Sequence, residues 1–180
     1  FYHFLTIPGG RKVNGSELSP IDTALTMAGV LFVSQYYNDP EISALAKDLL
    51  ERVDWPWMLN GGKTFALAWS PERGFFRQRW DHYDESSLLY LIALASSTHP
   101  IPNSSWNAVR RTAGSYGEYR LIISPPLFTH QYPYIWFDFR NKNDGTADYF
   151  ENSREATLAQ RQFAMDQSKR FSSYGPDSWG

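Results

Sequence analysis

The chain has 180 residues, a formal net charge of −2 and 42% hydrophobic residues. That length is sufficient for one domain with a hydrophobic core, and the composition excludes a disordered chain. The small negative charge gives no reason to expect nucleic acid or an anionic membrane as a partner. The absence of cysteine excludes disulfides and thiolate metal sites. No apolar run approaches the roughly 18 residues expected of a membrane span.

Aromatic residues are the compositional excess, with 7 Trp, 11 Tyr and 12 Phe. Aromatic faces stack on sugar rings, bases or lipid chains, but aromatic residues also fill cores, so composition alone does not choose between these roles. The sequence begins at Phe1 without a signal-like segment. We therefore expect it to be a portion of a longer protein.

Two helices are predicted in the first third of the chain. Ser19 and Pro20, with an acid at Asp22, form a close relative of the capping box, and apolar residues then recur at helical spacing on all sides to about Tyr36. This pattern predicts a helix that is buried all round. A second helix should begin after Asp39 with one apolar stripe, which is typical of a surface helix.

The middle of the chain combines turn signals with a polar stretch that leads into an apolar helix. Residues 65–80 carry short apolar and aromatic runs separated by Pro71 and Gly74, which predicts a small β-hairpin. Residues 80–86 (WDHYDES) then lead into residues 88–95, which are apolar throughout. We expect a buried helix with carboxylates at its first turn, where the buried layer meets solvent.

The last third is predicted to hold three further helices. Ser104 or Ser105 should cap a short helix to about residue 111, followed by a long connection. Residues 127–140 are apolar and aromatic enough to form another buried helix, although Pro133 obscures its start. A capping box over residues 148–151 opens an amphipathic helix to about residue 165.

Buried and amphipathic helices thus alternate, which is the pattern of helical hairpins packed in two layers. In such an array the buried helices point the same way, so their N-termini share one rim. Asp22, Glu85 and residues 129–131 should meet there. Paired carboxylates beside an aromatic-lined cavity suit glycoside hydrolysis, which needs one acid and one base or nucleophile. A second interpretation stays open, because an acid in the first turn of a helix also serves as a cap or complements the helix dipole.

Several ordered motifs resemble the bacterial glycoamylase-like domain, a family that includes endo-β-1,2-glucanases and the central domain of cyclic β-1,2-glucan synthases. The resemblance covers essentially the whole chain, and its motifs are residues 16–24, 80–86 (WDHYDES), 97–102 (STHPIP), 127–132 (LFTHQY) and 148–157 (DYFENSREAT). It implies an all-α fold, an (α/α)6 toroid, of which this chain would be a part with about three helical hairpins and a small β-hairpin. Residues 1–180 would form a single domain, a portion of that barrel.

The resemblance also implies site residues and an activity on β-1,2-glucan or related gluco-oligosaccharides. Glu85 would be the proton donor, and Asp22 is the best second carboxylate. Other carboxylates stay open: Glu17 precedes its helix and could reach the rim, whereas Glu151 and Glu155 are explained by capping and ion pairing. Candidates for sugar binding, for each of which core packing is the alternative, are Trp69, Trp80, His82, Tyr83, His130, Gln131, Tyr132 and Trp136.

No metal or other cofactor is implied by the resemblance, and the four histidines show no His-Glu-x-x-His spacing. The expected partner is a carbohydrate substrate. Two alternative functions remain, namely transglycosylation as in cyclic β-1,2-glucan synthesis and a non-catalytic carbohydrate-binding helical module. A hydrolase would be periplasmic or secreted, whereas a cyclic glucan synthase would be tethered to the membrane from the cytoplasm.

Overall fold

The computed structural model describes residues 1–179, and the chain divides into two compact units. The first unit comprises Phe1–Asp81 and Ser86–Arg110, and the second comprises His82–Glu85 and Arg111–Gly180. The expectation of a single domain over residues 1–180 stays a prediction.

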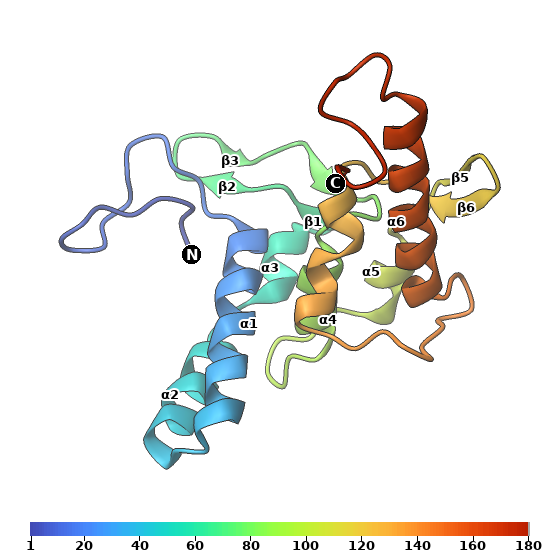
Figure 1. Ribbon diagram of the computed structural model, residues 1–180. Coiled ribbons are helices and arrows are strands. Elements are labelled where there is room, and N and C mark those ends of the chain that lie inside the picture. Colours follow the sequence, from blue (N-terminus) through green and yellow to red (C-terminus); the bar gives the residue numbers. More distant parts are fainter. Residues whose placement is uncertain (180) are drawn as a thin grey trace. The chain divides into compact units, whose positions relative to one another are not determined.

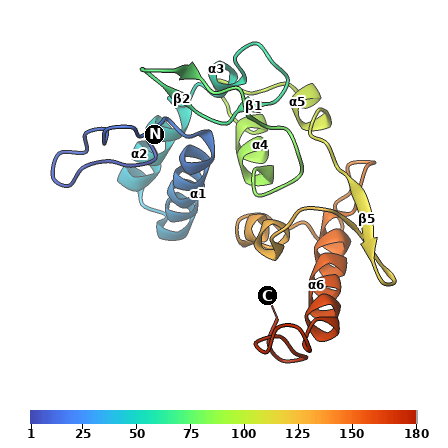
Figure 2. The same ribbon diagram turned by 90° about the horizontal axis from the view of Figure 1, so that it is seen from above.

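Helices are the main regular elements of the first unit (Figure 1). The first two, α1 and α2, lie side by side as a helical hairpin (Figures 1 and 2). Both are capped as the sequence predicted. The Ser19 side chain accepts a hydrogen bond from the Asp22 N–H at the start of α1, and the Asp39 side chain accepts backbone N–H bonds at the start of α2. The helices are α1 (Pro20–Tyr37), α2 (Pro40–Glu51), α3 (Trp55–Leu59), α4 (Ser87–Leu94) and α5 (Asn103–Asn107).

Helix α1 is buried in its first half only. Ala24 and Met27 are fully buried, but Phe32 is 60% exposed and Tyr36 is 71% exposed. The prediction of a helix buried all round is therefore wrong for the second half of α1. Helix α2 follows the surface-helix prediction more closely, with Ala46 its only buried residue among those described.

Helix α4 is buried as predicted, with Leu88, Leu89 and Tyr90 fully covered. It begins at Ser87, after a Ser86 N-cap that makes no side-chain capping bond. The prediction that carboxylates occupy its first turn is wrong, because Glu85 and the aspartates precede the helix. Helix α5 begins after Pro102, so the prediction that Ser104 or Ser105 caps it is also wrong.

The predicted hairpin over residues 65–80 is confirmed. At the base of the hairpin, β1 (Phe65–Ala66) pairs with β4 (Arg79–Trp80). At its tip, β2 (Trp69–Ser70) pairs with β3 (Gly74–Phe75). The hydroxyl of Tyr90 in α4 accepts from the Phe65 N–H at 3.3 Å and donates to the Trp80 carbonyl at 2.6 Å. The buried helix therefore holds both strands at the base of the hairpin.

The second unit is built on helix α6 (Tyr149–Asp166), whose capping by Asp148 confirms the prediction. A second hairpin, β5 (Ala113–Tyr116) and β6 (Tyr119–Ile122), packs beside α6 (Figure 2). A long connection without strands was expected here, so this hairpin corrects that expectation. The turn depends on Gly117, whose φ of +56° is a conformation that favours glycine.

Residues 127–140 form two short 3₁₀ turns, η1 (Leu127–His130) and η2 (Tyr132–Ile135), in place of the predicted buried helix. Pro133 has no N–H to donate and its ring clashes with the preceding turn of an α-helix, so it disfavours a continuous regular helix here. The premise of a third buried helix at the shared rim is therefore wrong, as is the count of about three helical hairpins. Asp22 and Glu85 belong to different units, and their common location stays a prediction.

A buried polar network occupies the centre of the second unit. His130 is 2% exposed, its Nδ1 lies 3.2 Å from Asn152 Nδ2, and its ring lies 5.6 Å from that of Tyr83. Tyr83 also stacks on Tyr149 at 5.6 Å. Asn152 Oδ1 accepts a hydrogen bond from the Ile122 N–H at 2.7 Å, so the network ties α6 to the second hairpin. Every member finds a partner, as buried polar groups require.

Within residues 1–179, no helix has both the length and the apolar character needed to cross a bilayer.

Replacing Ser19 with alanine tests the capping of α1. The change removes the acceptor of the Asp22 N–H at 3.2 Å, and loss of such a cap costs about 0.5 to 2 kcal/mol of the free energy of unfolding. Chemical denaturation of the two proteins measures the difference. Ser104→Ala is the matched control, because Ser104 is exposed inside α5 and caps no helix. Equal losses from both variants would contradict the cap.

The pH dependence of stability tests the buried position of His130. Burial lowers the pKa of His130 below 6.5, against a smaller opposing effect of its hydrogen bond with the Ser124 backbone. Below pH 6.5 the unfolded chain then binds the proton more readily, so the free energy of unfolding should decrease as the pH falls towards the lower folded pKa. Denaturation at about pH 7.5 and about pH 5.5 measures this decrease.

His130→Asn should flatten that pH dependence, since asparagine does not titrate yet leaves an acceptor near the position of Nδ1. The matched control is His99→Asn, the same chemical change at an exposed position. A slope in His130→Asn equal to that of the parent would show that another group is responsible.

Candidate active site

The first unit gathers two carboxylates at the start of α1. Asp22 stands in the first turn, with its side chain 35% exposed, and Glu17 lies just before the helix, 25% exposed. His3 lies between them, with Nδ1 2.7 Å from Glu17 Oε1 and Nε2 3.9 Å from Asp22 Oδ2. Both acids were predicted from the sequence, but His3 was not. Only backbone pairing brings that residue to them, so the linear sequence carries no signal for it.

Glu85, the predicted proton donor, lies in the short segment His82–Glu85 of the second unit. Its side chain is half-buried in the turn that precedes α4. Tyr83, two residues earlier, is buried in the aromatic network, whereas His82 is exposed. The segment is therefore anchored by Tyr83 while Glu85 stays in partial reach of solvent. Asp81 belongs to the first unit and pairs with Arg110 at 2.9 Å.

Aromatic side chains of the first unit surround the tip of its hairpin. Trp69 is half-buried and meets Trp57 edge to face at 5.5 Å, and Trp57 also lies 4.8 Å from Phe75. Trp57 is 41% exposed and lines a cavity of about 400 Å³ with residues of α2, α3 and the start of α1. Trp80 is half-buried, and its Nε1 is buried without a hydrogen-bond partner among residues 1–179.

A second cavity, of about 460 Å³, lies along the segment that follows η2. Trp136 lines it together with aromatic neighbours and the ion pair between Asp138 and Arg140, whose closest atoms are 2.8 Å apart. Hydrogen bonds from Arg140 hold the pKa of Asp138 well below its usual range, so this carboxyl group is ionised. Trp136 was predicted, but Asp138 and Arg140 were missed. In the sequence these two charged residues alternate with Phe137 and Phe139, and that pattern could have indicated them.

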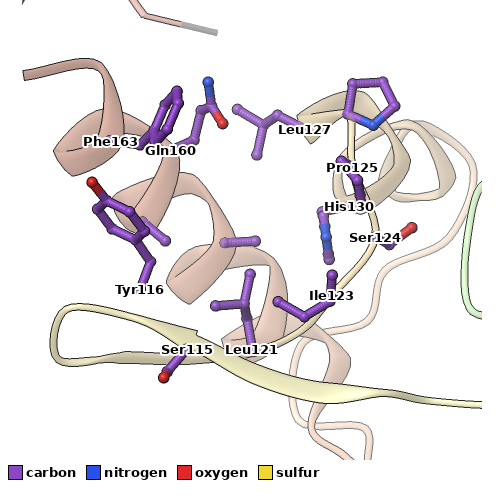
Figure 3. A pocket seen from close by; sticks show the side chains of 13 residues that line it. Ser115, Tyr116, Leu121, Ile123, Ser124, Pro125, Leu127, His130, Gln160 and Phe163 are labelled. Atoms are coloured by element: carbon purple, nitrogen blue, oxygen red, sulfur yellow. The ribbon is translucent and has the colours of Figure 1, made fainter. Parts of the chain in front are cut away.

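A third cavity, of about 230 Å³, is lined mainly by apolar side chains between β5–β6, α6 and the segment before η1. Figure 3 shows Tyr116 and Phe163 towards one end of it and His130 and Ile123 towards the other. His130 borders this cavity, but its ring is engaged by Asn152 and by the Ser124 backbone. Those partners favour a structural role for His130.

The two remaining predicted residues lie on or beside the 3₁₀ turns. Gln131 is exposed and donates from Nε2 to Thr157 Oγ1 at 3.3 Å, and Tyr132 is half-buried at the start of η2. Within residues 1–179, no group of three or more His, Asp or Glu side chains could hold a metal ion.

Each unit thus brings together a different part of the predicted site. The first holds Asp22, Glu17 and the hairpin tryptophans, and the second holds Glu85 and the residues from His130 to Trp136. The separation between Asp22 and Glu85 stays a prediction. Chemically, the first unit offers two carboxylates on either side of an imidazole ring, and the second offers a partly accessible acid and an aromatic cavity lined by an ion pair.

Comparison with known proteins identifies relatives of the whole chain. A family described as "Putative glucoamylase" matches residues 77–180. The exo β-1,2-glucooligosaccharide sophorohydrolase (non-reducing end) of Parabacteroides distasonis is 23% identical over 206 residues, which cover 95% of this chain and 28% of that protein.

Solved structures show the same fold. An endo-β-1,2-glucanase from Chitinophaga pinensis, in complex with sophorotriose and glucose, is 28% identical with a TM-score of 0.83, covering 98% of this chain and 46% of that one. A crystal structure described as a putative glucoamylase, from Bacteroides uniformis, is 26% identical with a TM-score of 0.84. The match covers 98% of this chain and 47% of that one.

The chain therefore spans less than half the length of these relatives. Within that span its helices and small sheets match theirs closely, and the family match covers more than half of its residues. The chain belongs to the glycoamylase-like family, which its sequence motifs indicated.

Proposed function

We propose that the full-length protein is a glycoside hydrolase that cleaves β-1,2-linked glucose polymers or oligomers, with Glu85 as proton donor and Asp22 as second carboxylate. One observation carries the proposal: 98% of this chain aligns at 28% identity with an endo-β-1,2-glucanase solved with sophorotriose and glucose. The sophorohydrolase named above supports the same linkage. Release of new reducing ends from β-1,2-glucan, but not from β-1,3- or β-1,4-glucan, is the direct test.

The proposed chemistry needs one acid that can donate a proton and one group that stays ionised. Glu85 protonates the glycosidic oxygen as its bond to the anomeric carbon breaks. Asp22 either takes a proton from the attacking water or attacks the anomeric carbon itself. The carboxyl separation in the complete site decides between these: about 5 Å favours retention and about 6.5 to 9.5 Å favours inversion.

Sugar rings would bind against the aromatic side chains of the two units. Trp136 and its neighbours offer apolar faces beside the Asp138–Arg140 pair, which offers charged hydrogen-bonding groups to sugar hydroxyls. Trp57 and Trp69 offer a similar surface at the hairpin tip. The buried positions of Tyr83 and His130 favour packing roles that hold Glu85 and the neighbouring turns in place.

We further propose that this chain forms part of an (α/α)6 toroid. The apolar second half of α1 supports this, because an exposed cluster of large apolar side chains on a helix marks a surface that another element covers. Phe32 stacks on Tyr36 at 6.1 Å, and Tyr36 meets Tyr37 at 5.0 Å, on the outside of the described helical hairpin. Relatives about twice as long have the additional residues for such a cover.

Glu85→Gln should abolish turnover while it leaves the fold and sugar binding nearly intact. Glutamine has the size of glutamate but cannot protonate the leaving oxygen, and the loss of acid catalysis of this kind is about 10²- to 10⁴-fold. Reducing-end assays on β-1,2-glucan measure kcat, and calorimetric titration with an oligosaccharide measures binding. The matched control is Glu118→Gln, the same chemical change on the exposed β5–β6 turn.

Rates of Glu85→Gln within about tenfold of the parent would end the case for Glu85 as the acid. Product analysis in the same assay separates hydrolysis from transglycosylation, because transfer yields new linkages without a matching rise in reducing ends.

Phe32→Ala tests the toroid. If further helices cover α1, the change should lower the free energy of unfolding of the full-length protein by roughly 3 kcal/mol, as for other large-to-small core changes. If Phe32 stays 60% exposed, the loss should be within about 0.5 kcal/mol. Thermal or chemical denaturation distinguishes the two results. Gln35→Ala, at an exposed polar position of the same helix, should change little in either case.

A further inference from the structure

The first residues of the chain are held against the start of α1 by backbone hydrogen bonds. The His3 N–H donates to the Glu17 carbonyl at 2.9 Å, and the Ser19 N–H donates to the Phe1 carbonyl at 3.0 Å. Tyr2 and Leu18 form an antiparallel bridge between these bonds. This short pairing places His3 beside the first turn of α1 without any contribution from its ring.

The imidazole ring of His3 extends from Glu17 towards Asp22. Its Nδ1 lies 2.7 Å from Glu17 Oε1, which is hydrogen-bond distance, and its Nε2 lies 3.9 Å from Asp22 Oδ2, which is ion-pair distance. The ring also stacks on Phe4, with centroids 4.1 Å apart and planes 13° apart. Three neighbours therefore define both the plane of the ring and the direction of its two nitrogens.

The hydrogen bond to Glu17 determines which nitrogen faces Asp22. A carboxylate only accepts, so Nδ1 carries the proton of the Glu17–His3 bond. Burial would raise the pKa of Glu17, but its hydrogen bonds with His3 and with backbone lower it, so Glu17 is ionised at neutral pH. Nε2 is left pointing to Asp22. Because a carboxylate only accepts, the ring attracts both carboxylates in its imidazolium form, in which Nδ1 and Nε2 each carry a proton.

We propose that His3 is a positioning residue for Asp22: Glu17 orients the ring, and the ring, with a proton on each nitrogen, holds the Asp22 carboxylate in its reactive direction. This inference rests on the proposed function, in which Asp22 is the second carboxylate. A carboxylate that acts on an anomeric carbon or a water must be held in one orientation, because a displacement of about 1 Å can cost about 10²-fold in rate. Asp22 is 35% exposed, so its own packing leaves its orientation weakly constrained.

A purely structural role for His3 makes a different prediction. In that case the ring would serve only to tie the first residues to Glu17, and the contact with Asp22 would be incidental. Two substitutions separate these roles, since the amide of asparagine occupies the region of Nδ1 and the amide of glutamine reaches the region of Nε2. His3→Asn can keep the bond to Glu17 and loses the contact with Asp22. His3→Gln can keep the contact with Asp22.

The experiment measures kcat and KM of the full-length protein on β-1,2-glucan. His3→Asn should lower kcat by about 10- to 100-fold with KM within about twofold, whereas His3→Gln should retain more of the activity. Melting temperatures should stay near that of the parent, because backbone bonds hold the segment. The matched control is His99→Asn, because His99 is exposed and its hydrogen bonds are with Ser96 and Thr98, which belong to the same loop.

A double-mutant cycle with Asp22→Asn completes the test. If His3 acts through Asp22, His3→Asn should cause no further loss of the residual rate of Asp22→Asn. Additive losses, a change confined to KM, or a His3→Asn protein with parental kcat would overturn the inference while leaving the role of Asp22 intact. Parental activity of Asp22→Asn would instead refute the proposed second carboxylate, and the positioning role of His3 with it.

Discussion

Two backbone hydrogen bonds between Leu18 and Trp69 determine how the first unit is assembled. The Leu18 N–H donates to the Trp69 carbonyl at 2.7 Å, and the Trp69 N–H donates back at 3.0 Å. Leu18 also bridges to Tyr2, so three segments that are distant in sequence meet at one residue. Helix α1 begins two residues later, which fixes Asp22 relative to the aromatic hairpin. The backbone bonds at Leu18 therefore link the segment that carries Glu17 and Asp22 to the tip of the hairpin.

The base of that hairpin is secured by a single buried hydroxyl group. Tyr90 is fully buried in α4, and its oxygen both accepts from β1 and donates to β4. Its ring also packs edge to face against Phe65 at 5.1 Å, which in turn meets Trp55 at 6.4 Å. The hydroxyl both accepts and donates, which satisfies the hydrogen-bonding requirement of a buried polar group. The buried helix thus serves as the platform for the strands that carry Trp69 and Trp80.

In the second unit, the ion pair that lines the cavity comes from residues outside the regular helices and strands. Asp138 and Arg140 are two residues apart and form an ion pair at 2.8 Å. Residues two apart on an α-helix point in different directions, so the predicted helix over 127–140 would have separated them. The 3₁₀ turns and the irregular segment after them instead place this pair beside Trp136 around one cavity. The irregular backbone of residues 127–140 thus explains both why the helix prediction was wrong and why this cavity is present.

The sequence by itself determined the local elements and the family. The starts of α1, α2 and α6 were predictable because a capping side chain acts within three residues of its own helix. The burial of α4 followed from its uninterrupted apolar run, and the first hairpin followed from its turn residues. Ordered motifs along the whole chain indicated the glycoamylase-like family.

Only the tertiary structure decided which side chains meet. The exposure of Phe32, the second hairpin and the split of residues 127–140 all depend on partners or backbone breaks outside the local pattern. His3 is the clearest case: it reaches Glu17 and Asp22 across 14 and 19 positions of sequence because backbone pairing folds its segment onto the start of α1. Helical periodicity reports on neighbours three or four residues apart, so contacts made through such pairing leave no trace in it.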